Sequence, residues 1–247
     1  MREIFVTGKS LADAYHDSLL ELHGNGEFAA CPDWSTTQLE TSMTIHIPHA
    51  TWEPMISKLF IGGPHELEQY RQEMLDGILD FEILKGNWTY TYHERMEYQY
   101  QFVIDELRRN PDSRRAVIDI RRHSDMKTND PACLQHIQYF IRDDALHCKV
   151  LFRSNDAVKA TFMNAFALIM LQKRIAEELG VEVGSYTHRA NSFHCYKKDL
   201  DRLTYYVNHI LKKPLEQLSY NYEGDWKDLM EAEQEAIAEK VRKLRGE

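Results

Sequence analysis

The chain has 247 residues, of which 43% are hydrophobic and 28% charged, and its formal net charge is −9. This balance is ordinary for a globular protein with one large domain or two small ones. The acidic surplus excludes a protein that coats nucleic acid by displacing counterions, although a few arginines would suffice for a nucleotide pocket. No apolar run is long enough to span a bilayer, so we expect no membrane partner.

Cysteine usage favours a reduced compartment. There is no CxxC pair, and residues 1–4 resemble neither a signal nor a transit peptide, so we expect a cytoplasmic protein. His188, His194 and Cys195 lack the spacing of a zinc site, and no metal is expected.

In the first half of the chain, apolar spacing predicts helices over residues 10–22 and from 64 to about 79. Polar residues 27–41 predict a loop between them, and alternation at 42–47 predicts a strand. Residues 88–95 combine aromatic rings with polar groups and are assigned to no element.

In the second half, alternation predicts strands at 116–120 and 182–190 and a hairpin over 136–152 with a polar turn at 142–144. Helical spacing covers residues 98–109, 155–179, 197–211 and 225–245.

The longest helical pattern, 155–179, is strongly apolar and ends before Gly180, which predicts a buried central helix. Strands mixed with long helices predict an α+β fold with a mixed β-sheet. Without repeats or linkers, we expect one domain over residues 1–247, with 225–247 as a charged helical tail.

Cys133 precedes the hairpin and Arg153 follows it. A hairpin of this length returns its two ends to one place, so the guanidinium is expected near the thiol. A nearby cation lowers a thiol pKa, and the thiolate is the nucleophilic form. The alternative for Cys133 is a small buried hydrophobe.

Several motifs then occur in one order, which makes a specific pattern. They are Asp112-Ser113-Arg114-Arg115, Pro131-Ala132-Cys133-Leu134-Gln135, Phe152-Arg153-Ser154-Asn155-Asp156, Asn164 and His194-Cys195-Tyr196. With them, residues 88–199 resemble the thymidylate synthase family, chiefly its short archaeal-type and phage-type members. The resemblance implies that family's fold and one-carbon transfer from 5,10-methylenetetrahydrofolate to C5 of a pyrimidine nucleoside monophosphate.

In that chemistry a thiolate adds to C6 of the pyrimidine and makes C5 enolate-like. The resemblance implies Cys133 as the nucleophile and Tyr92 as an aid to proton removal from C5. It implies phosphate contacts from Arg153 and Ser154. Arg114 and Arg115 would reach the phosphate of a partner subunit, which implies a homodimer with shared sites; otherwise they are a surface basic pair.

Asn164 lies within the apolar helix, where a carboxamide needs a partner. The resemblance implies that it contacts the pyrimidine, and its paired donor and acceptor match uracil, whereas an aspartate would match cytosine. His194 and Tyr196 would bind the sugar hydroxyl.

Asp156 resembles the aspartate that contacts the folate pterin, although it could simply cap the long helix. A catalytic glutamate that organises water is also expected, and Glu66, Glu68 and Glu73 are the candidates.

Three departures from the family pattern affect the interpretation. Lys159 and Ala160 replace a Leu-Gly pair near the folate. The stretch 31–37 lacks the family's phosphate-binding arginine, which leaves Arg95 as a substitute. Residues 242–247 do not match the aliphatic C-terminal residue that closes the site against water.

Closure decides the product, because hydride delivery to the exocyclic methylene gives a methyl group and water gives a hydroxymethyl group. The unmatched C-terminus favours hydroxymethylation, but the match to short family members leaves a thymidylate synthase as our first expectation. A nucleotide hydroxymethylase acting on dUMP, dCMP or CMP is the first alternative. A catalytically silent homologue that binds nucleotide or RNA is the second.

Overall fold

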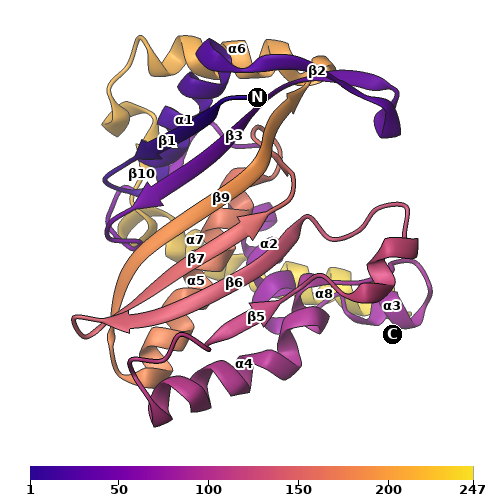
Figure 1. Ribbon diagram of the computed structural model, residues 1–247, viewed down its shortest axis with the longest axis vertical. Coiled ribbons are helices and arrows are strands. Elements are labelled where there is room, and N and C mark those ends of the chain that lie inside the picture. The colour runs from indigo at the N-terminus through magenta and orange to yellow at the C-terminus, as the bar shows by residue number, and fades with distance from the viewer. Residues whose placement is uncertain (247) are drawn as a thin grey trace.

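The computed structural model describes residues 1–246, and its centre is a mixed sheet in the order β1-β3-β9-β7-β6-β5 (Figure 1). The β1–β3 and β7–β9 pairs are parallel, and the other neighbouring pairs along this order are antiparallel. The strands are β1 (Glu3–Thr7), β2 (Glu27–Cys31), β3 (Thr36–Ile47), β5 (Val117–Asp119), β6 (Leu134–Arg142), β7 (Ala145–Phe152), β8 (Asn155–Asp156) and β9 (Glu182–Tyr196), with a separate pair formed by β4 (Ile56–Ser57) and β10 (Ser219–Tyr220).

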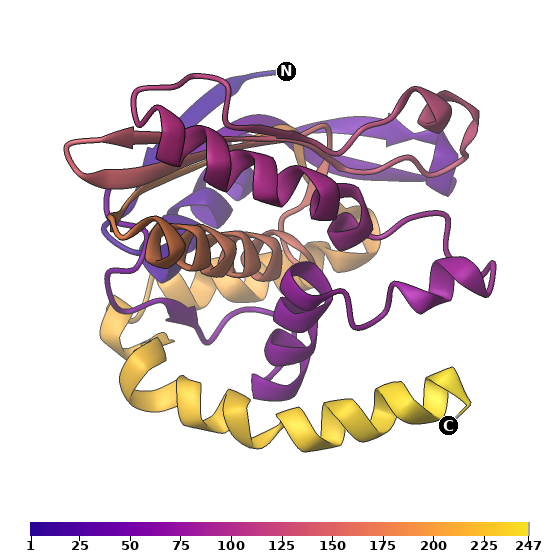
Figure 2. The ribbon, with the colours of Figure 1, turned by 90° about the horizontal axis from the view of Figure 1, so that it is seen from below.

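Most helices pack on one side of the sheet, and Figure 2 shows the layers edge-on, with the opposite face of the sheet left without a helical layer in the described part of the chain. The helices are α1 (Leu11–Asn25), α2 (Pro64–Asp76), α3 (Phe81–Leu84), α4 (Tyr92–Arg109), α5 (Thr161–Leu179), α6 (Leu200–Ile210), α7 (Lys227–Ala232) and α8 (Gln234–Arg245). Within residues 1–246 no helix combines the length and apolar character needed to cross a membrane.

The predicted α+β class and the buried central helix are confirmed. In α5, Phe162, Phe166 and Ile169 are at most 2% exposed, and their rings and side chains join the main hydrophobic core beneath the sheet. The hairpin is also confirmed: β6 pairs with β7, and Asp143 and Asp144 form its turn with φ of 51° and 57°. The sheet thus carries residues 133 and 153 to one end of the hairpin.

The predicted loop at 27–41 is wrong. Residues 27–31 form β2, and β3 begins at Thr36 rather than at 42. The β2–β3 arm carries exposed Phe28 and few buried side chains, so its strands lack the apolar alternation that would reveal them. The strand β1 was not predicted either, because three of its five side chains face solvent.

Three predicted helix starts are also wrong. Helix α4 begins at Tyr92 rather than at 98, because Thr91 caps it by accepting from the Glu94 N–H at 3.0 Å. Helix α5 begins at Thr161 rather than at 155, because the β8 residues pair with β9. Helix α6 begins at Leu200, after a short 3₁₀ turn over Lys197–Asp199.

The predicted tail is helical, but it is two helices, α7 and α8, that meet at Glu233. In α7, Leu229 is 51% exposed while its neighbour Met230 is buried. Helix α8 packs through Ile237 and Val241.

Candidate active site

Arg153 lies against the loop that carries Cys133, as predicted from the hairpin. The Arg153 N–H donates to the Cys133 carbonyl at 2.8 Å, Nε donates to the Ala132 carbonyl at 3.1 Å, and one Nη donates to the Pro131 carbonyl at 2.6 Å. The same nitrogen lies 3.4 Å from an Asp130 carboxylate oxygen. The other Nη makes no hydrogen bond within the described chain, so it can face a ligand.

The expectation that Arg153 keeps Cys133 anionic needs correction. Burial raises the pKa of the Cys133 thiol above its ordinary value, and the charge of Arg153 opposes this shift without cancelling it. The Asp130 carboxylate adds to the rise. The thiol is therefore mostly protonated at neutral pH.

Three phenols surround Cys133. Tyr92 contacts the residue next to Cys133, since its hydroxyl accepts from the Leu134 N–H at 3.3 Å. Burial raises the pKa of Tyr70, Tyr90 and Tyr92, with that of Tyr90 at about 12, and the neighbouring Cys133 charge raises each further. All three phenols are thus neutral hydrogen-bond donors near the thiol.

Asn164 faces this cluster from α5. Its side chain is 5% exposed, and Tyr70 from α2 donates its hydroxyl proton to Asn164 Oδ1. The Asn164 Nδ2 group has no hydrogen-bond partner in the described residues, so it can donate to a ligand. Tyr70, Tyr90 and Tyr92 line an adjoining cavity of about 210 Å³.

The three candidate glutamates lie in different surroundings. Glu66 accepts from the Gly63 N–H at the start of α2, and Glu68 is bound by Arg71 at 2.7 Å. Glu73 lines the cavity of the phenols, and burial raises its pKa. Of the three, only Glu73 lines that cavity, one helical turn from Tyr70.

The ends of β7 and β9 gather the remaining predicted residues. Asp156 pairs in the parallel ladder with His194, and the Ser154 hydroxyl lies 3.4 Å from His194 Nδ1. His194 Nε2 is buried and has no partner in the described chain. Tyr196 packs edge-on against the His194 ring at 4.7 Å. His194 and Tyr196 therefore lie within β9, not after a strand.

Asp156 has the local role that sequence left open. Its Oδ1 accepts from the N–H groups of Val158 and Lys159, each at 2.9 Å, and so holds the turn before α5. It also lines a second cavity of about 270 Å³ with Trp34, Lys159 and Tyr196. The two functions are compatible, because the N–H groups occupy one carboxylate oxygen.

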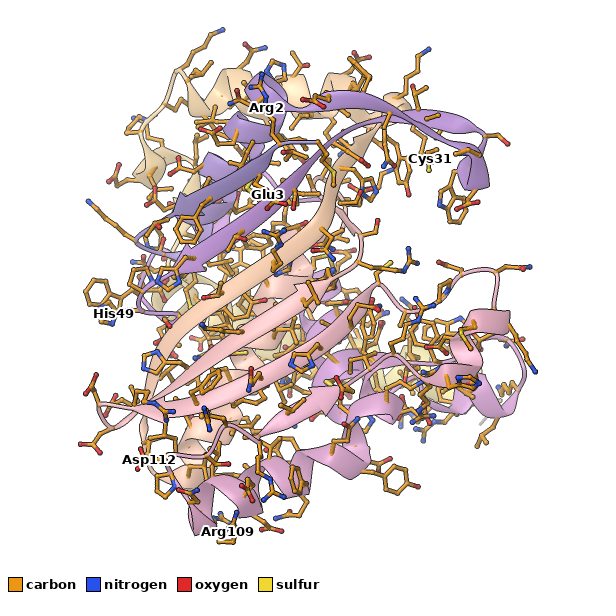
Figure 3. All side chains as sticks on the ribbon, viewed as in Figure 1. Arg2, Glu3, Cys31, His49, Arg109 and Asp112 are labelled. Carbon is orange, nitrogen blue, oxygen red and sulfur yellow. The ribbon has the colours of Figure 1, made fainter. Side chains whose placement is uncertain are left out.

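Arg114 and Arg115 are not brought to Cys133 of the same chain. They precede β5, in which Val117 pairs with Gln138. A strand rises about 3.3 Å per residue, so Gln138 in β6 lies roughly 16 Å from Cys133, and the arginines that precede its partner Val117 lie at least as far away. Figure 3 shows the neighbouring Asp112 near the turn of the hairpin, far from Cys31 on the β2–β3 arm. Arg115 is 73% exposed.

Arg95 cannot replace the missing phosphate ligand. Its guanidinium is 5% exposed and forms two hydrogen bonds to Asp125, at 2.9 and 3.1 Å, and one to the Ile120 carbonyl at 3.0 Å. His188 is buried between the Tyr186 hydroxyl and Asn155. In residues 1–246 no three His, Cys, Asp or Glu side chains are placed to hold a metal.

A cysteine that lies beside a guanidinium and neutral phenols in an α+β fold is typical of an enzyme acting through covalent catalysis. The chain belongs to the thymidylate synthase family, whose sequence model, described as thymidylate synthase, matches residues 67–240. It is therefore a one-carbon transferase of a family that uses methylenetetrahydrofolate as co-substrate, binds pyrimidine nucleotides and is typically dimeric.

The relatives span archaea and a phage. A Methanocaldococcus jannaschii protein named "Putative thymidylate synthase" is 32% identical over 220 residues, which cover 82% of this chain and 96% of that protein. A Methanosarcina mazei protein of the same name is 34% identical over 201 residues, 79% of this chain and 91% of the relative. The thymidylate synthase of Bacillus phage phi3T is 29% identical over 146 residues, 57% of this chain and 51% of the phage protein.

Tyr70 was not among the predicted site residues, because it counts toward the apolar spacing that predicts its helix. The available signal was a phenol, which needs a hydrogen-bond partner when buried, one turn before Glu73 on that helix.

Proposed function

We propose that this protein is a thymidylate synthase, which converts dUMP and 5,10-methylenetetrahydrofolate to dTMP and dihydrofolate. The observation that carries the proposal is the gathering of Cys133, Arg153, Tyr92 and Asn164 into one cluster, although they come from four separate segments. Arg153 bonds to the residue before Cys133, Tyr92 bonds to the residue after it, and Tyr70 links Asn164 to the surroundings of the thiol.

Each residue has a chemical part in the proposal. Cys133 Sγ adds to C6 of dUMP, and the resulting C5 enolate attacks the one-carbon unit. Tyr92, a neutral phenol hydrogen-bonded beside the nucleophile, assists removal of the C5 proton. The Asn164 carboxamide holds the uracil edge, with Nδ2 donating to O4 and Oδ1 accepting from N3–H.

The outer part of the pocket receives the remainder of the ligands. Arg153 and Ser154 bind the phosphate, and His194 with Tyr196 binds the sugar hydroxyl, which gives the unpaired His194 Nε2 a partner. Asp156 contacts the folate beside Lys159 and Tyr196. Glu73 is our candidate for the catalytic glutamate, because it lines the cavity of the phenols.

We further propose a homodimer in which Arg114 and Arg115 reach the partner's phosphate. Their distance from Cys133 in one chain supports sharing, as does the sheet face without a helical layer (Figure 2). Mixing Arg114→Ala with Cys133→Ala subunits tests this. Each variant alone should be inactive, and mixed dimers should regain about a quarter to a half of the wild-type activity. Absence of recovery in mixed dimers would contradict sharing.

We also propose that residues 1–247 form one domain, since a single core cluster extends from Val6 to Met230.

One observation favours the hydroxymethylase alternative. Helix α8 packs through Ile237 and Val241 on Leu79, and Arg245 lies 5.1 Å from the Phe81 ring. Helix α8 therefore packs behind Leu79, which lines the cavity of the phenols, and it does not cover Cys133. Exclusion of water from the thiol by α8 is consequently weak.

Mass spectrometry of the product formed from dUMP and methylenetetrahydrofolate separates the two activities. A methyl product with dihydrofolate supports thymidylate synthase, and a hydroxymethyl product with tetrahydrofolate replaces it by the hydroxymethylase. Cys133→Ala is the control, because it should bind dUMP without forming either product. Turnover of a cytidine nucleotide without turnover of dUMP would contradict the assignment of Asn164.

A further inference from the structure

The contact between Tyr70 and Asn164 joins two helices inside the pocket. Tyr70 comes from α2 and Asn164 from α5, 94 residues later, and the phenol donates to Asn164 Oδ1. In the described chain this is the single hydrogen bond of the Tyr70 hydroxyl, and the Asn164 Nδ2 group is left without a partner. The contact therefore orients an otherwise open carboxamide.

The orientation of a carboxamide decides which pyrimidine it can bind. Uracil presents N3–H as a donor and O4 as an acceptor, whereas cytosine presents N3 as an acceptor and its amine as a donor. An asparagine can match either base, because a half turn of its amide exchanges Oδ1 and Nδ2. Asn164 by itself is consequently a weak discriminator.

We infer that Tyr70 is the positioning residue that makes this site select uracil over cytosine, an inference that rests on the proposed function. With uracil bound, Oδ1 accepts from both Tyr70 and N3–H, and Nδ2 donates to O4, so the Tyr70 hydroxyl and both groups of the uracil edge have partners. With cytosine bound, the half turn brings Nδ2 against Tyr70. The hydroxyl must then accept, and its own hydrogen is buried without a partner in the described chain.

Burying a hydroxyl without an acceptor costs enough free energy to change the ratio of the two nucleotide affinities. We expect Tyr70 to contribute roughly tenfold to the preference for dUMP over dCMP. Neighbouring groups do not remove this effect, since Tyr90, Tyr92 and Glu73 share the cavity but none is hydrogen-bonded to the Tyr70 hydroxyl.

The test measures binding of dUMP and dCMP by calorimetry, in a Cys133→Ala background that prevents turnover. Tyr70→Phe removes only the hydroxyl and keeps the packed ring. Tyr100→Phe is the matched control, because it removes a phenol that donates to Glu178 at 2.6 Å outside this pocket. Thermal unfolding of each variant reports whether the fold is kept. Should Tyr70→Phe unfold, Tyr70→Met gives the same comparison, because it also removes the hydroxyl, leaves Asn164 intact and fills the space with an apolar side chain.

We expect the ratio of dCMP to dUMP dissociation constants to fall roughly tenfold in Tyr70→Phe and to stay unchanged in Tyr100→Phe. An equal weakening of both nucleotides would overturn the inference, because it would show a merely structural role. An unchanged ratio would overturn it while leaving the proposed function intact. If the parent Cys133→Ala protein binds neither nucleotide, the proposed function and the inference both fail.

Discussion

Replacement of Arg95 by methionine should destabilise the protein strongly, because it leaves a buried carboxylate unpaired. Arg95 and Asp125 are 5% and 2% exposed, and their two hydrogen bonds are 2.9 and 3.1 Å long. The remaining partner of Asp125 would be the Arg122 N–H at 3.0 Å. The pair fastens the start of α4 to the segment that leads toward Cys133.

The magnitude follows from what is lost. Removing one partner of a buried, hydrogen-bonded ion pair costs about 3–5 kcal/mol, a large part of the roughly 5–15 kcal/mol by which a domain is stable. Arg95 also holds the pKa of Asp125 below its ordinary value, so the pair's contribution is present above pH 4 and disappears as the pH falls further. Arg95→Met should therefore destabilise at pH 7, and by less as the pH falls below 4.

Urea unfolding at pH 7, followed by circular dichroism, measures the change. Arg122→Met is the matched control, since Arg122 pairs with Glu94 at 2.9 Å but is 45% exposed and should cost at most about 1 kcal/mol. The double variant Arg95→Met with Asp125→Leu should regain part of the loss, because no unpaired charge remains. A loss for Arg95→Met as small as that of the control would refute the reasoning.

Three further predictions concern charge and catalysis. Asp130→Asn should speed iodoacetamide alkylation of the Cys133 peptide at pH 7.5 by roughly two- to fivefold, since the carboxylate raises the thiol pKa; slower alkylation would contradict this. Lowering the pH from 7 to 5 should reduce the free energy of unfolding by roughly 4 kcal/mol. The reason is that buried His16 and His188 have a pKa of about 4 and about 3 in the folded protein, whereas both bind protons below 6.5 once unfolded; a fall below about 1 kcal/mol in urea titrations would be inconsistent with this. Glu73→Gln should reduce kcat roughly a hundredfold with dUMP affinity nearly kept, and steady-state kinetics with an unchanged kcat would exclude Glu73 as the catalytic glutamate.

The parts of the fold predicted from sequence are those with a strong period. The β6–β7 hairpin alternates cleanly, and α5 repeats apolar residues over five turns. The β2–β3 arm was missed because none of the five β2 side chains is buried. The predicted start of a helix was wrong where a capping side chain determines it, as Thr91 does for α4.

Within the candidate site, the closeness of Cys133 and Arg153 could be predicted because one hairpin connects them. The ion pair between Arg95 and Asp125 could not be predicted, since no periodic pattern links a buried guanidinium to a carboxylate 30 residues away. The role of Tyr70 could not be predicted for the same reason, because its partner Asn164 lies 94 residues later in the chain.

These long separations have a consequence for how the protein acquires activity. The pocket needs α2, α4, the β6–β7 hairpin and α5 in place together, since Tyr70 bonds to α5 and Tyr92 to the residue after Cys133. Contacts between distant segments form late, because the loops between them must close first. During refolding, nucleotide binding should therefore return after most of the helical signal, as one of the last properties regained.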